Sequence, residues 1–129
     1  MSVGVEYSGG FKFLLRSRGH EVVSDQPSSS GGRDEGMTPP ELLAGALGAC
    51  IGVYVARFCR RHGVSTHGLR INVSWRVDEP SERICEMEAR ILLPGLDDKF
   101  RSTLLRVAES CLIHRTIRNP PQVKISLES

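Results

Sequence analysis

The fold of this protein is decided by residues 38–63, TPPELLAGALGACIGVYVARFCRRHG. Thr38 stands at the position of a helix N-cap, a proline follows at the first helical position, and Glu41 completes a capping box. Gly63 is a typical residue just beyond a helix end, so the predicted helix runs over 38–62. Apolar residues and small residues form two separate stripes along it, which predicts a central helix buried on more than one face.

Three glycines lie in the interior of this predicted helix, at Gly45, Gly48 and Gly52. Each of them costs about 1 kcal/mol of helix stability relative to alanine. We expect this cost to be offset by another helix or a ligand that approaches the helix backbone closely.

Downstream of the helix, alternating apolar and polar residues predict a hairpin over residues 69–93, with Cys85 on the apolar face of its second strand. Asp97 then predicts the N-cap of a second helical region, 97–118, whose apolar stripe includes Cys111. A short last strand is predicted at 122–127.

Residues 1–30 predict short N-terminal strands, followed by a Ser/Gly loop. The order strands, long helix, hairpin, helix and strand predicts an α+β fold in which antiparallel sheets pack on the long central helix and a second helix. A length of 129 residues suits a single domain, 1–129.

Composition and charge exclude several classes of protein. Seventeen Lys and Arg against 15 Asp and Glu leave a net charge of +2, which predicts no nucleic-acid partner. With 40% hydrophobic and 25% charged residues, the chain resembles ordinary soluble proteins and predicts no membrane partner. The N-terminus has no signal-peptide-like run, so we expect a cytoplasmic protein. Phosphate-loop, metalloprotease and serine-hydrolase motifs do not occur, and we expect no cofactor.

Four cysteines are the main candidates for chemistry, and cytosolic thiols favour catalysis or metal binding over structural disulfides. We expect Cys85 in the strand core and Cys59 at an exposed helix end, which leaves Cys50 and Cys111. Each of these two is also compatible with simple core packing. A thiolate at Cys50 lies too far from the helix start for the helix dipole to stabilise it, so it needs a cation. Fourteen of the 17 cations are arginine, which suits geometrically fixed contacts to anions.

Two Cys-x-x-His pairs offer a zinc hypothesis. Cys59 with His62, and Cys111 with His114, together have the ligand types of a tetrahedral site. Nothing in the intervening strands brings the two pairs together, and we expect no metal site.

Residues 37–50, MTPPELLAGALGAC, together with AESCLIHR at 108–115, resemble the OsmC/Ohr family of osmotically induced and organic hydroperoxide resistance proteins. The resemblance extends from about residue 31 to residue 127. It implies a homodimer of intertwined chains with active sites between the subunits. It also implies a peroxidase in which Cys50 attacks an organic hydroperoxide and becomes a sulfenic acid, Cys111 condenses with it to a disulfide, and a dithiol reductant restores both thiols.

The resemblance further implies an arginine that holds the thiolate and a glutamate that orients this arginine. Arg18 and Arg33 both suit the position of the arginine. The family glutamate aligns with Pro40, whereas Glu41 lies one residue later, so Glu41 is either catalytic or only a capping residue. These departures are typical of the broader OsmC-like branch. They leave a second hypothesis, in which the chain is a small-molecule-binding or redox-sensing dimer without efficient turnover.

Overall fold

The computed structural model describes residues 1–129, which divide into two compact units, Met1–Ala44 and Gly45–Ser129. The boundary between the units falls inside helix α1 (Pro39–His62) and not in a linker. The single domain expected from the sequence stays a prediction.

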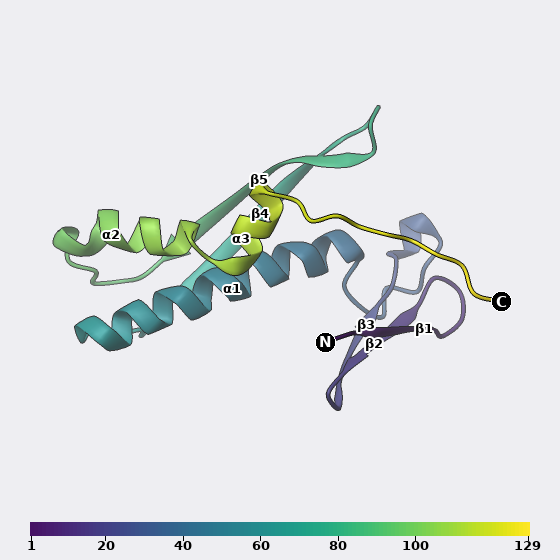
Figure 1. Ribbon diagram of the computed structural model, residues 1–129, viewed down its shortest axis with the longest axis horizontal. Coiled ribbons are helices and arrows are strands. Elements are labelled where there is room, and N and C mark those ends of the chain that lie inside the picture. The colour runs from purple at the N-terminus through teal and green to yellow at the C-terminus, as the bar shows by residue number, and fades with distance from the viewer. The chain divides into compact units, whose positions relative to one another are not determined.

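The first unit contains a three-stranded antiparallel sheet with the strand order β1-β2-β3 (Figure 1). Its strands are β1 (Gly4–Tyr7), β2 (Phe13–Ser17) and β3 (His20–Ser24), and a short 3-10 helix, η1 (Ser28–Ser30), follows. Arg18 and Gly19 join β2 to β3, and both have positive φ values, 52° and 79°. A two-residue turn of this kind matches the right-handed twist of the strands that it connects.

Helix α1 begins at the capping box that the sequence predicts. The backbone N–H and the hydroxyl of Thr38 donate to Glu41 Oε1 at 2.9 and 2.8 Å, and the N–H of Glu41 donates to Thr38 Oγ1 at 3.4 Å. These Thr38 donors lower the pKa of Glu41. The helix ends at His62, before Gly63 with φ 64°. By length and composition alone, α1 could span a membrane, a test that core helices of soluble proteins also pass.

The second unit packs a two-stranded antiparallel sheet and two helices on α1 (Figure 1). Its elements are β4 (Arg70–Asp78), β5 (Arg83–Leu92), α2 (Asp98–Glu109) and α3 (Leu112–Arg118). Asp97 caps α2 as predicted, because its carboxylate accepts the N–H of Lys99 at 3.0 Å. The core is formed by residues of α1, α2, the segment just after β5 and the α2–α3 turn: Leu47, Ile51, Val55, Phe58, Cys59, Leu93, Leu104, Ala108 and Cys111.

Strand β4 packs closely against α1 at two of the three glycines in the helix interior. A Cβ atom at Gly48 would lie 3.2 Å from Val73 Cγ2, and one at Gly52 would lie 3.3 Å from Ile71 Cδ1. A Cβ at Gly45 would meet nothing within 4 Å. The element that approaches the α1 backbone is therefore a strand of the same chain, and the expectation of a helix or ligand at Gly48 and Gly52 is wrong.

The predicted positions of two cysteines are wrong. Cys59 is 0% exposed, because the buried stripe of α1 continues to its last turns, where Phe58 packs edge-on against Phe100 of α2. Burial raises the pKa of the Cys59 thiol. Cys85 is only half-buried, at an irregularity in the β4–β5 register, and its thiol donates to the carbonyl of Arg76 at 3.5 Å.

The last strand expected at 122–127 is also absent. The chain after α3 is extended but pairs with no strand, as the yellow end of the ribbon shows (Figure 1). Val123, Ile125 and Leu127 are 74%, 94% and 92% exposed. The alternation that predicts a strand is present, but a strand also needs a neighbouring sheet edge, and this chain supplies none to it.

Candidate functional site

The structure brings Cys50 and Cys111 together in the second unit. Cys111 is 0% exposed and belongs to the core, and Cys50 is half-buried and packs against the same core. Burial raises the pKa of the Cys111 thiol, and the neighbouring Cys50 raises it further. Both cysteines are free thiols. The arrangement therefore places two reduced sulfur atoms side by side, one of them partly open to solvent.

Cys50 lies at the border between the buried and the exposed face of α1. Its neighbours Leu47 and Ile51 are buried, whereas Ala49 and Val53 are exposed. One side of the thiol therefore faces the core, and the other side borders small apolar groups at the surface. A half-buried thiol with small neighbours is accessible to a small oxidant.

Cys111 lies in the turn between α2 and α3 and not on the apolar stripe of α2, where the sequence placed it. Helix α2 ends at Glu109, and Cys111 caps α3 by accepting the N–H of His114 on its sulfur at 3.3 Å. Burial is the largest effect on the pKa of Cys111 and raises it, and the neighbouring Cys50 raises it further. The N–H groups of His114 and Ile113 oppose this shift without cancelling it.

The histidines of the two Cys-x-x-His pairs are engaged elsewhere. The His62 ring packs against Phe58, with ring centroids 4.3 Å apart. His114 Nδ1 donates to the carbonyl of Glu109 at 2.6 Å. No group of three or more His, Cys, Asp or Glu side chains is placed to hold a metal ion.

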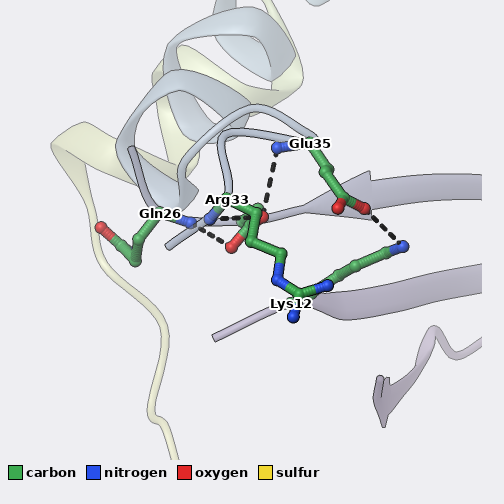
Figure 2. Close-up of polar contacts among 5 residues, drawn as sticks. Lys12, Gln26, Arg33 and Glu35 are labelled. Atoms are coloured by element: carbon green, nitrogen blue, oxygen red, sulfur yellow. Dashed lines mark hydrogen bonds and ion pairs between the residues drawn. The ribbon is translucent and has the colours of Figure 1, made fainter. Parts of the chain in front are cut away.

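Asp25 organises a loop in the first unit that the sequence predicted only as Ser/Gly-rich. Its carboxylate is 2% exposed and accepts the N–H groups of Gln26, Arg33 and Glu35 at 2.7, 3.3 and 3.1 Å (Figure 2). Lys12 on the sheet side of the loop forms an ion pair with Glu35 at 2.9 Å (Figure 2). Burial by itself would raise the pKa of Asp25, but the three N–H donors and the charge of Lys12 together lower it.

The three supporting residues named from the sequence, Arg18, Arg33 and Glu41, all belong to the first unit. Arg18 occupies the β2–β3 turn, Arg33 lies in the loop of Figure 2, and the Glu41 carboxylate is occupied by the capping box. The ion pairs of this unit use Lys12 and Arg16, and neither Arg18 nor Arg33 takes part in one. Their catalytic roles stay predictions.

Comparison with known proteins identifies one family and one shared fold. The family model described as OsmC-like protein matches residues 32–126. No curated protein sequence matches the chain. The predicted α+β fold is confirmed by the following structures.

A protein of Psychrobacter arcticus 273-4, assigned to the osmotic stress and detoxification response, is 22% identical and has a TM-score of 0.83 over 90% of this chain and 87% of that one. A hypothetical protein of Aquifex aeolicus VF5 is 21% identical, with a TM-score of 0.77 over 98% and 93%. The organic hydroperoxide resistance protein OhrB of Bacillus subtilis is 19% identical, with a TM-score of 0.61 over 93% of both chains. At these identities, the likeness shows the fold.

Proposed function

The chain belongs to the OsmC-like family, and on that premise we propose that it is a thiol-dependent peroxidase that reduces organic hydroperoxides. The observation that carries the proposal is the pairing of the half-buried Cys50 thiol with the buried Cys111 thiol. The shared fold with a protein named for organic hydroperoxide resistance supports the choice of substrate.

In the first step, the Cys50 thiolate attacks the terminal oxygen of the hydroperoxide, RO–OH. An S–O bond forms and the O–O bond breaks, so that the sulfur is oxidised to sulfenic acid and the peroxide is reduced. The leaving alkoxide takes up a proton and departs as the alcohol.

In the second step, the Cys111 sulfur attacks the Cys50 sulfur. An S–S bond forms, the S–O bond breaks, and the hydroxyl group leaves as water with the proton of Cys111. A dithiol reductant then gives up two electrons and two protons by thiol–disulfide exchange, and both cysteines return to thiols. The position of both thiols at the same core supports this step, because a disulfide requires two cysteines that lie close together.

We propose that Arg18 or Arg33 stabilises the Cys50 thiolate, and that Glu41 either orients this arginine or only completes the capping box. The guanidinium groups of both arginines are free of carboxylate partners, which supports their availability for an anion. Arg18→Gln and Arg33→Gln, each compared with Arg60→Gln on the exposed end of α1, identify which arginine serves the thiolate. The arginine that stabilises the thiolate is the one whose replacement lowers the peroxidase activity most.

We also propose that the protein acts as a homodimer in the cytoplasm, where a dithiol reductant can recycle it. The proposed dimer would cover apolar surface that a single chain leaves exposed, such as Val53 on α1 and the C-terminal residues Val123, Ile125 and Leu127. Gly48 and Gly52 no longer support a dimer, since β4 of the same chain covers them.

A second candidate function is a redox-sensing dimer that forms the disulfide but is not recycled efficiently. The burial and raised pKa of Cys111 favour this alternative, because a protonated thiol is a poor nucleophile and resolves the sulfenic acid slowly. Sustained turnover with a dithiol would exclude it.

The deciding experiment measures consumption of cumene hydroperoxide in the presence of dithiothreitol. We expect multiple turnovers by the wild type, none by Cys50→Ser, and wild-type turnover by Cys85→Ser, a matched half-buried thiol outside the pair. Turnover that persists in Cys50→Ser would overturn the peroxidase assignment. A single stoichiometric Cys50–Cys111 disulfide without recycling would favour the sensor.

A further inference from the structure

His114 holds the turn that carries Cys111 with two hydrogen bonds. Its backbone N–H donates to Cys111 Sγ at 3.3 Å, and its ring Nδ1 donates to the carbonyl of Glu109 at 2.6 Å. The sequence indicated His114 only as a neighbour of Cys111. In the structure, the ring points to a backbone carbonyl at the end of the preceding helix and not to the sulfur.

The ring hydrogen bond ties the first turn of α3 to the end of α2. Glu109 is the last residue of α2, and the last carbonyls of a helix have no partner within the helix. A carbonyl oxygen can only accept, so Nδ1 of His114 carries the proton in this contact. The turn between the two helices, with Cys111 in it, is thus closed by a side chain.

We propose that His114 is a positioning residue for the second chemical step, and this proposal rests on the proposed function. By holding the α2–α3 turn, the ring keeps Cys111 Sγ beside Cys50, in place to attack the sulfenic acid. The hydrogen bonds of His114 go to Cys111 and to the Glu109 carbonyl, so the proposed role is exerted through Cys111. Its loss therefore slows the closure of the disulfide and leaves the oxidation of Cys50 unchanged.

The geometry of the second step makes it sensitive to such a change. Closure requires two sulfur atoms to meet with restricted distances and dihedral angles. Cys111 is fully buried, so its sulfur has little room to search for Cys50 once the turn loosens. A small displacement of a reacting group is enough to slow a step by about tenfold or more.

The experiment oxidises the reduced protein with one equivalent of cumene hydroperoxide and follows the two steps separately. Dimedone trapping with mass spectrometry measures the sulfenic acid at Cys50, and non-reducing mass analysis measures the disulfide. In His114→Ala we expect closure to slow about tenfold and sulfenic acid to accumulate, with an unchanged rate of Cys50 oxidation.

Two conservative variants separate positioning from general packing. His114→Asn retains an N–H donor at the place of Nδ1 and should restore closure, whereas His114→Gln places its donor further out and should not. Thr116→Val is the matched control, since it removes another side-chain hydrogen bond of α3, from Thr116 Oγ1 to the carbonyl of Leu112 at 2.8 Å. It should leave both rates unchanged.

Three outcomes would each overturn the positioning role. The disulfide could close at the wild-type rate in His114→Ala, or closure could slow equally in Thr116→Val. His114→Ala could also lose both chemical steps and have a lower melting temperature. If His114→Ala does not fold, the contrast between the Asn and Gln variants decides, and equal closure rates in these two overturn the role. A wild type that forms neither a sulfenic acid at Cys50 nor the Cys50–Cys111 disulfide refutes the proposed function itself, and the inference falls with it. If the wild type forms the Cys50–Cys111 disulfide, an unexpected result for the His114 variants contradicts only the positioning role.

Discussion

The Cys50 thiol on α1 lies beside the Cys111 thiol in the turn before α3, and the second thiol is completely buried while the first is partly open. This asymmetry assigns different tasks to the two sulfur atoms. An oxidant from solvent meets Cys50 first, and Cys111 is reached only through the protein. The proposed order of reaction, with attack by Cys50 and resolution by Cys111, follows from the difference in access.

Replacing Cys111 with serine should separate the two steps. Cys111→Ser retains Cys50 and should consume about one equivalent of hydroperoxide, because its sulfenic acid has no thiol to condense with. Intact-protein mass spectrometry should show Cys50 as sulfenic acid or, after excess peroxide, as sulfinic acid. A disulfide in this variant that involves Cys59 or Cys85 would contradict the pairing.

Disulfide closure should accelerate as the pH rises. Burial, reinforced by Cys50, raises the pKa of Cys111, so most of this thiol is protonated at neutral pH and the attacking thiolate becomes more abundant only in alkaline solution. Single-turnover closure rates measured between about pH 7 and pH 10 should rise throughout this range. Rates that do not change with pH would show that proton loss from Cys111 does not limit closure.

Cys59→Ser should destabilise the fold without affecting the chemistry. The serine hydroxyl would replace a thiol that is 0% exposed in an apolar core, and an unpartnered buried hydroxyl costs about 1–3 kcal/mol. Urea unfolding measures this loss. Cys85→Ser, at a half-buried position, is the control and should lose much less stability.

Asp25 should contribute to stability in a way that is lost at acid pH. Its pKa is lowered in the folded protein, so its contribution is fully present above the pKa of the unfolded carboxyl and disappears as the pH falls through the folded value. Asp25→Asn should therefore flatten the acid side of the stability profile and lower the melting temperature at neutral pH. Asp34→Asn, an exposed residue of the same loop with φ 55°, should leave the profile unchanged.

The proposed dimer predicts the effect of a charge on the exposed face of α1. Val53 is 48% exposed in the single chain, and a dimer that covers it would have to bury the carboxylate of Val53→Glu. Sedimentation should show the wild type as a dimer and this variant as a monomer. Arg61→Glu, at the polar end of the same helix, should remain dimeric, and a monomeric wild type would refute the dimer.

Local chemistry in the sequence was sufficient to predict the main elements. The capping box of Thr38 and Glu41 and the glycine at 63 correctly bound α1, and strict alternation correctly predicts the β4–β5 hairpin. Neither signal depends on distant residues, because caps and alternation act over a few positions. The same kind of signal failed at 122–127, where a strand also requires a partner edge that this chain does not supply.

The sequence by itself determined the order of N-terminal strands, long helix, hairpin and second helical region, and it singled out four thiols. Only the tertiary structure decided that Cys59 is buried, that Cys111 lies in a turn beside Cys50, and that Asp25 organises its loop. The physical reason is the distance along the chain over which each interaction acts. Helix caps and strand periods are set by neighbours in the chain, whereas burial, pKa shifts and the meeting of two sulfur atoms depend on packing between distant segments.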